Sequence, residues 1–168
     1  SYNQHLQFLE EYFRIIFEGM NGDAFEILNS LVVEIYNNKG IDANTDLSKL
    51  KPEDYPIFDD LYNLILKKSA ESDDAYIKRN LQILQAYVQK FATGGRNSRL
   101  WNGPTSIETD ENFVCFNFQS LISNRNRTVA SAQMLLVFKY LDNEILKNKD
   151  FNKKYKTQRK IVVAVDEA

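Results

Sequence analysis

The sequence has very few of the residues that cross-link small folds or hold metal ions. Its 168 residues include one cysteine, Cys115, and one histidine, His5. No intrachain disulfide can form, and a lone histidine without a CxxC pair argues against a zinc site. We expect Cys115, inside the apolar run FVCFNF, to be a small buried hydrophobic residue, and His5 to lie at the surface of a helix start. This cysteine usage fits a reducing, cytosolic setting.

Proline, glycine and long hydrophobic runs are scarce as well. Three prolines and six glycines, with 43% hydrophobic and 26% charged residues, exclude a disordered chain or a fibrous repeat. The length suits one core, or one domain with part of another. No apolar run approaches the roughly 18 residues of a membrane span, and no signal peptide opens the sequence. The first residue is not methionine, from which we expect a piece of a longer protein.

Charge is distributed unevenly along the chain. Residues 1–75 carry 15 acids and 6 bases, whereas residues 76–168 carry 8 acids and 15 bases. The formal net charge of −2 conceals this difference. The asymmetry predicts two regions with different roles.

The apolar spacing of the first region predicts four helices, over 5–17, 24–38, 55–68 and within 72–95. Asp23 would cap the second helix, and Asp73 or Asp74 the fourth. We expect residues 1–93 to form a helical bundle. The inward-facing residues that the spacing selects in its first, second and fourth helices are Leu6, Leu9, Phe13, Ile16, Ile27, Leu28, Leu31, Val32, Ile35, Ile77, Leu81, Leu84 and Val88.

The pattern changes after Gly95. Short strands are predicted at 105–109 (TSIET) and 112–118 (NFVCFNF), then a long helix over 128–148, then a buried strand at 161–165 (IVVAV). The inward residues of the long helix would be Ala132, Leu135, Leu136, Tyr140 and Ile145. Strands joined by a helical crossover of this length should be parallel. The predicted fold class is therefore α+β and mostly α, a helical bundle (1–93) followed by a partial α/β core (94–168) with few parallel strands and one long helix.

The last predicted strand runs directly into Asp166 and Glu167. Ligands of doubly wound α/β proteins bind at the carboxyl ends of parallel strands. There an Asp can hold Mg²⁺ through water, and an adjacent Glu can accept a proton from the water that attacks a γ-phosphate. An apolar run followed by Asp-Glu is thus the Walker B pattern of nucleotide hydrolases. The alternative is a strand that simply ends in solvated acids.

The partner motif of such a site is missing. A phosphate-binding loop has the form GxxxxGK[ST], because glycine amides surround the phosphates and the lysine reaches the β and γ oxygens. None of the six glycines is followed by Lys-Ser or Lys-Thr. A nucleotide hydrolase made of this chain alone would lack its phosphate-binding loop.

Several motifs, taken in order, resemble one known family. They are Gly94-Gly95, the turn Trp101-Asn102-Gly103-Pro104-Thr105, the run 113–118, and Val165-Asp166-Glu167-Ala168. Together they resemble the traffic ATPases of conjugative type IV secretion systems, the family of the fourth VirB component, in the HerA/FtsK-like branch of P-loop ATPases. The resemblance covers 91–168, and residues 1–90 share only helical character. The family often has an acidic residue where this chain has Asn117, which therefore receives no role.

The resemblance implies a piece of an ATP-hydrolysing motor that powers conjugative DNA transfer or type IV secretion for a conjugative plasmid or transposon. The parent would be a homo-hexamer in the cytoplasm, at the inner face of the cell membrane, with other channel components as partners. Asp166 would bind Mg²⁺ through water, and Glu167 would be the catalytic base. ATP and Mg²⁺ would bind only in the intact parent, so the piece alone is expected to be inactive. The alternative is a stand-alone helical adaptor or DNA-binding module of a mobile-element protein.

Two basic features remain open to more than one interpretation. Arg96, Arg99, Arg125 and Arg127 flank the predicted strands, and could serve as an arginine finger in a hexamer, contact DNA phosphates, or be solvated loop charges. The connector 147–160 (KNKDFNKKYKTQRK) has seven bases with Phe151 and Tyr155 interleaved. This is the composition of a weak nucleic-acid groove, or of a polar lead-in to a buried strand. Trp101 could anchor a partner or pack its own turn onto the core.

Overall fold

The computed structural model describes residues 1–107, 111–123 and 126–166. The chain forms two compact units, a first unit of Ser1–Asn112 and a second unit of Phe113–Ala168. The division predicted from the sequence, into a helical subdomain (1–93) and a motor core (94–168), is one of function and stays a prediction.

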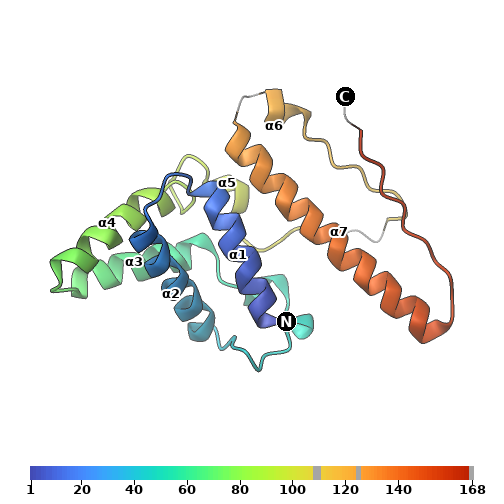
Figure 1. Ribbon diagram of the computed structural model, residues 1–168, viewed down its shortest axis with the longest axis horizontal. Coiled ribbons are helices and arrows are strands. Elements are labelled where there is room, and N and C mark those ends of the chain that lie inside the picture. Colours follow the sequence, from blue (N-terminus) through green and yellow to red (C-terminus); the bar gives the residue numbers. More distant parts are fainter. Residues whose placement is uncertain (108–110, 124–125, 167–168) are drawn as a thin grey trace. The chain divides into compact units, whose positions relative to one another are not determined.

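The first unit is helical, as predicted. Its helices are α1 (Tyr2–Ile16), α2 (Gly22–Asn38), α3 (Phe58–Glu71), α4 (Ala75–Val88) and the one-turn α5 (Ser98–Trp101), with the 3-10 turns η1 (Leu47–Lys49) and η2 (Pro52–Asp54) between α2 and α3 (Figure 1). The four long helices match the four that the apolar spacing predicts, with shifts of a few residues at their ends.

Side-chain caps determine where these helices begin. Ser1 and Gln4 form a capping box at the start of α1. Asp74 caps α4 by accepting hydrogen bonds from the backbone N–H groups of residues 76 and 77, at 2.8 and 3.0 Å. The prediction for α2 was wrong, because the cap is Asn21, which accepts from the N–H of Ala24 at 2.8 Å. Asp23 instead lies in the first turn, where its negative charge interacts favourably with the helix dipole.

The core of the first unit lies where α2, α3 and α4 pack against one another. Leu28, Leu61, Ile65, Leu84 and Val88 are almost completely buried there. Each such side chain contributes roughly 1.5–3 kcal/mol when it leaves water. The apolar stripes predicted for α2 and α4 therefore face inward. The exception is Ile77 in the first turn of α4, which is 38% exposed.

His5 lies near the start of α1, as predicted, but it is half-buried in a ring cluster rather than fully exposed. Its Nε2 lies 2.7 Å from the hydroxyl of Tyr36. Its ring also lies 5.7 Å from that of Tyr55, whose hydroxyl donates to the carbonyl of Leu47 at 3.2 Å. Burial, with the neighbouring Tyr55 and Tyr2 hydroxyls, raises the pKa of Tyr36 above its usual value. This cluster joins α1, α2 and the segment between α2 and α3.

The second unit is built on one long helix. It contains the short α6 (Gln119–Ser123) and the 29-residue α7 (Arg127–Tyr155), and α6 packs against α7. The ring of Phe116 lies 5.8 Å from that of Tyr140 on α7, which fixes the segment before α6 to this helix. After α7 the chain reverses direction and runs back as an extended segment (Figure 1).

The predicted α+β fold class, with a partial α/β core of parallel strands after the helical bundle, was wrong. No residue in the described ranges belongs to a strand, and the runs 112–118 and 161–165 are extended without pairing. The predicted strand 105–109 is irregular over 105–107, and its last two residues lie outside the described residues. The fold that fits the structure is a helical bundle with a second unit around α7.

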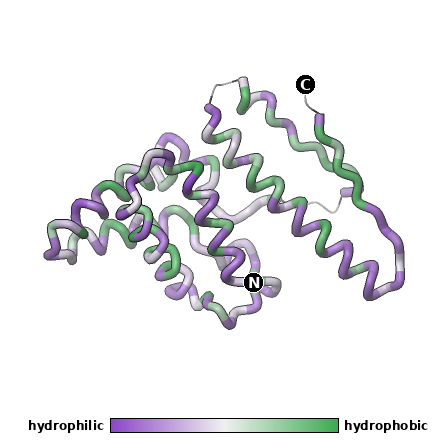
Figure 2. Tube along the Cα trace, viewed as in Figure 1, coloured by the Kyte–Doolittle hydropathy of each residue, from purple (hydrophilic) through white to green (hydrophobic). Residues whose placement is uncertain are grey.

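The physical reason is that a buried parallel strand needs neighbours on both edges and both faces. The run 161–165 has none of this cover, since Val162 is 87% exposed and Val165 is 73% exposed. In Figure 2 this run is a hydrophobic stretch that follows a hydrophilic one. Its β-branched composition is typical of a strand, but composition alone supplies no partner strand.

Three further predictions for the second unit need correction. Cys115 is exposed and not buried, because the run around it is not covered. The helix predicted over 128–148 continues to Tyr155, so most of the connector 147–160 is helical. On α7, Ala132 is buried as predicted, but Ile145 is 46% exposed.

Two absences concern the parts of the chain that the structure describes. Within them, no helix combines the length and apolar character that crossing a membrane requires. Nor do any three His, Cys, Asp or Glu side chains gather there in a way that could hold a metal ion.

Candidate functional site

The segment 91–104, which carries two of the predicted arginines, is anchored to the bundle by Trp101. Its ring stacks on Phe91 at 5.5 Å and meets the edge of Tyr12 at 5.5 Å. Phe91 in turn stacks on Phe58 at 5.2 Å. Of the two interpretations of Trp101, the structure supports the one in which it packs its own turn onto the core.

A hydrogen-bond network ties the same segment to the start of α3. The carboxylate of Asp59 accepts from the backbone N–H of Thr93 at 2.7 Å and from its hydroxyl at 2.6 Å. The amide of Asn102 accepts from the N–H of Asp59 at 3.0 Å and donates to the Thr93 hydroxyl at 3.3 Å. The Thr93 hydroxyl and backbone N–H hold the pKa of Asp59 below its usual range. The segment is thus fixed at both of its ends.

The two glycines of this segment have different roles. Gly94 adopts a φ of +84°, in the left-handed region that favours glycine. Gly95 is required by close packing, since an added Cβ would overlap the backbone carbonyl of Gln89 and the carbonyl group of Lys90. The Gly94-Gly95 motif therefore forms the turn that leads from α4 into α5.

Arg96 and Arg99 project from this fixed segment. Both are exposed, and Arg99 belongs to α5. The anchoring contacts at Thr93 and Trp101 enclose both positions, so their backbone is held in place. Of the other two predicted arginines, Arg127 is the first residue of α7 in the second unit, and Arg125 lies outside the described residues. The structure therefore brings two of the four arginines onto one segment.

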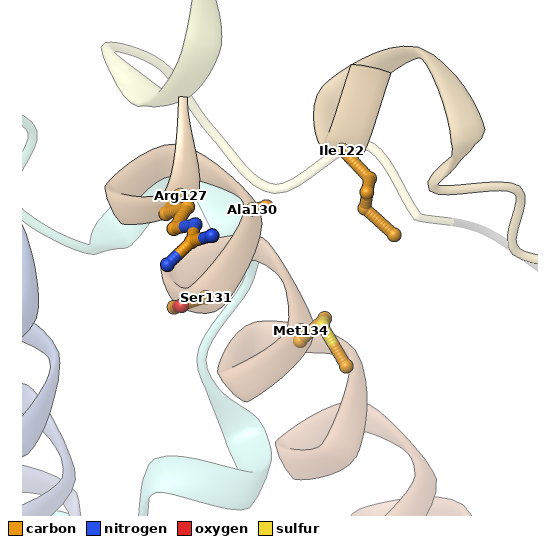
Figure 3. A pocket seen from close by; sticks show the side chains of 5 residues that line it. All are labelled: Ile122, Arg127, Ala130, Ser131 and Met134. Atoms are coloured by element: carbon orange, nitrogen blue, oxygen red, sulfur yellow. The ribbon is translucent and has the colours of Figure 1, made fainter. Parts of the chain in front are cut away.

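Arg127 borders a hollow between α6 and α7 that the sequence did not predict. The hollow has a volume of about 520 Å³. Figure 3 shows its lining, which consists of Ile122, Arg127, Ala130, Ser131 and Met134. The spacing of residues 127, 130, 131 and 134 places them on one side of α7, and this periodicity is the signal from which the hollow could have been expected. Its lining is mainly apolar, with one hydroxyl group at Ser131 and one cation at Arg127.

The acidic end of the chain is only partly described. Asp166 is exposed and follows the extended run 161–165, and Glu167 lies outside the described residues. No sheet edge surrounds Asp166 in the part of the chain that the structure describes. The roles predicted for these two acids therefore remain predictions.

Asn117, which received no role, has a local structural one. Its side-chain oxygen accepts a hydrogen bond from the backbone N–H of Gln119, at 2.9 Å. This bond satisfies a donor at the start of α6 that would otherwise have no partner in the helix.

Comparison with known proteins gives an informative match among solved structures. No protein-family model matches the chain, and no curated protein matches it. Among solved structures, the chain is similar to VirB4 of Thermoanaerobacter pseudethanolicus, with 26% sequence identity and a TM-score of 0.77. The match covers 86% of this chain and 52% of that one, so the chain spans about half the length of the solved VirB4.

This likeness extends beyond the motifs found in the sequence. Coverage of 86% requires that much of residues 1–90, which share only helical character with the family, also matches. The predicted resemblance to the VirB4 family is confirmed at the level of structure: the chain is similar to about half of a solved VirB4.

Proposed function

We propose that the chain is part of an ATP-hydrolysing motor that powers conjugative DNA transfer or another type IV secretion process. The structural likeness to VirB4 carries the proposal. The ending Val165-Asp166-Glu167, which has the Walker B pattern, supports it. Because the match covers about half of the solved VirB4, the activity, substrates and partners of a whole motor belong to the proposal.

Within this proposal, Asp166 contributes to Mg²⁺ binding through a water molecule and Glu167 is the catalytic base. By themselves, the residues present are not expected to form an ATP site. The sequence has no GxxxxGK[ST], and the described residues contain no group of three side chains suited to a metal ion. The phosphate-binding loop would therefore come from outside these 168 residues, and the chain alone is expected not to hydrolyse ATP.

The arginines have a place in the same proposal. An arginine finger must reach a phosphate on a neighbouring subunit from a backbone that does not move. Arg96 and Arg99 fit this requirement because Trp101 and the Asp59 network hold their segment. Arg125 and Arg127 are candidates for the same role or for contact with DNA phosphates. A homo-hexamer at the inner face of the membrane, together with other channel components, completes the proposed assembly.

The experiment that tests the proposal uses two forms of the protein. The 168-residue chain and a longer protein translated from the same reading frame are assayed for phosphate release from ATP with Mg²⁺. We expect no turnover by the chain, turnover by the longer protein, and a loss of about 10³-fold or more in the longer Glu167→Gln variant. Asp142→Asn, which removes an exposed acid on α7, is the matched control and should retain activity.

Two results would contradict the proposal. Turnover by the 168-residue chain that Glu167→Gln abolishes would mean that the site is complete without a phosphate-binding loop. A longer reading frame without GxxxxGK[ST] would contradict the motor function and favour the stand-alone helical adaptor.

A further inference from the structure

The C-terminal end of α7 carries the densest positive charge in the sequence. Residues 147–160 contain seven bases and one acid, Asp150. The formal net charge of the whole chain is −2, so the molecule as a whole does not attract polyanions. Any attraction of this kind must come from a local surface. We call residues 147–160 the basic end.

The backbone of the basic end is fixed by a reversal of the chain. Lys156 adopts a left-handed conformation with a φ of 52°, which ends α7. The amide of Asn152 then donates to the carbonyl of Arg159 at 2.8 Å and accepts from its N–H at 2.9 Å. Asn148 donates to the same carbonyl at 3.0 Å. Four residues after α7, the chain is still attached to the helix.

This reversal places cations over aromatic rings. The guanidinium carbon of Arg159 lies 4.7 Å from the centre of the Phe151 ring. Phe151 and Tyr155 lie 4.6 Å apart, and the ammonium of Lys154 lies 5.1 Å from the centre of the Tyr155 ring. Both rings are exposed, at 37% and 56%. The result is a set of flat apolar and guanidinium surfaces surrounded by lysines.

The helix dipole accounts for only part of this charge. Cations in the last turn of a helix interact favourably with its carbonyl end, but the effect falls off beyond that turn. The bases in the last turn of α7 are Lys153 and Lys154. Lys147 is paired with Glu144 at 2.6 Å. The helix dipole therefore does not explain the positive charge of Lys149, which lies earlier in α7. Nor does it explain the charges of Arg159 and Lys160, which lie beyond the helix.

We propose that the basic end binds single-stranded nucleic acid, with lysines at the phosphates and bases stacked on Arg159 and the ring pair. Such proteins combine cations that follow the backbone with aromatic or guanidinium planes that accept any base. An anionic membrane is the other polyanion to consider. A helix that enters a membrane surface needs an apolar face, and the only large apolar side chains in 147–160 are Phe151 and Tyr155.

The test measures binding of a fluorescein-labelled oligothymidylate of about 15 nucleotides to the full chain by fluorescence anisotropy, over a range of salt concentrations and without ATP. The double variant Lys149→Gln/Lys153→Gln removes two exposed bases of the basic end. We expect it to weaken binding about tenfold at low salt and to reduce the slope of log K against log salt by about 1.4. Lys67→Gln/Lys78→Gln removes two exposed lysines of the first unit and should leave binding unchanged.

A second variant separates stacking from charge. Arg159→Lys keeps the positive charge but removes the planar guanidinium, so we expect about fivefold weaker binding with an unchanged salt slope. Circular dichroism of each variant checks that α7 remains helical. Equal affinities for the wild type and both basic-end variants would overturn the proposal. So would binding to phosphatidylserine vesicles in place of the oligonucleotide. Because no ATP is present, these outcomes are independent of the proposed motor activity.

Discussion

The buried tyrosines of the first unit differ in how their hydroxyl groups are satisfied. The hydroxyl of Tyr36 meets His5 at 2.7 Å, whereas the buried hydroxyls of Tyr2 and Tyr12 have no hydrogen-bond partner among the described residues. A buried polar group without a partner costs free energy, because it has lost its bonds to water. Burial also raises the pKa of Tyr12. The core thus contains two tyrosines whose rings contribute more to the stability of the fold than their hydroxyl groups do.

This contrast predicts opposite outcomes for the same substitution. Tyr12→Phe should leave the free energy of unfolding unchanged or raise it by up to about 1 kcal/mol, because it removes an unsatisfied hydroxyl. Tyr36→Phe should lower it by about 1 kcal/mol, because His5 loses its partner. Urea denaturation followed by circular dichroism measures both. A larger loss for Tyr12→Phe than for Tyr36→Phe would show that the Tyr12 hydroxyl is satisfied in solution.

The hydrogen bonds of Asp59 predict that the stability of the folded chain depends on pH. Its pKa in the folded chain is lowered by the hydrogen bonds from Thr93. The stabilisation is therefore fully present above the unfolded pKa of about 4 and is lost as the pH falls towards the folded pKa. Asp59→Asn should cost about 1 kcal/mol at neutral pH, and this difference from the wild type should shrink at about pH 3. Urea denaturation at both pH values checks it. A difference that is independent of pH would contradict the assigned cause.

At this scale the sequence predicts best where burial follows helical spacing. Leu28, Leu84 and Val88 are buried as the spacing requires. The ring cluster around His5 was not predicted, because Tyr36 and Tyr55 lie far along the chain and no local pattern indicates them. Cys115 was misjudged because its burial depended on a strand that does not form.

Among the elements, the turn between α4 and α5 has the strictest requirements. It needs Gly94 for its backbone conformation and Gly95 for the space beside residues 89 and 90. Asn102 and Trp101 then fix its far end. The sequence identified these residues as a motif, but their function as a frame for Arg96 and Arg99 follows only from the contacts.

Two glycine substitutions test this frame. Gly95→Ala should lower the free energy of unfolding by about 2–3 kcal/mol, since the new methyl group would overlap the backbone of Gln89 and Lys90, directly after α4. Gly103→Ala adds a methyl group with no neighbouring atom within 4 Å and should be nearly neutral. Thermal unfolding of both variants measures the difference. Equal melting temperatures would mean that the turn adjusts without strain.

The run 161–165 shows why element type was mispredicted in the second unit. Three β-branched residues in a row favour an extended backbone, and the backbone is extended. Pairing, however, depends on other strands, and none lies within the described residues. A local pattern thus predicted the local conformation and failed for the sheet. The site predicted for the acids at 166–167 stays a prediction for the same reason, because it was placed at the end of a strand in a sheet.

The two units differ in how much core they contain. Among the residues that the structure describes, the buried apolar residues of the second unit are Val129, Ala130, Ala132 and Val137. Two of these are alanines and two are valines, whose small side chains bury little area, and burial is the dominant stabilising term in folding. The second unit also leaves Phe113 86% exposed. Most of the stabilising burial is in the first unit.

This difference predicts unequal folding of the two units in isolation. Residues 1–112 should unfold in one cooperative thermal transition, because their core is complete. Residues 113–168 should lose helicity gradually, with α7 as an isolated helix that little burial supports. Circular dichroism melts of the two pieces measure this. A sharp transition in residues 113–168 would show that their small core is sufficient.

For the molecule as a whole, the sequence predicted the helical bundle and the VirB4 resemblance, and it did not predict the form of the second unit. The motifs that resemble the family are short stretches of sequence, so they can be recognised before the fold is known. The hollow at Arg127 and the ring cluster at Arg159 depend on contacts made after folding. These sites could be found only in the structure.

The length of α7 has a mechanical consequence. A helix of 29 residues is about 44 Å long at about 1.5 Å per residue. The sequence of α7 contains neither proline nor glycine, the usual causes of a sharp kink. One end carries the hollow at Arg127, and the other carries the ring cluster of Phe151 and Arg159. A displacement imposed at one end is therefore transmitted to the other, as along a stiff rod.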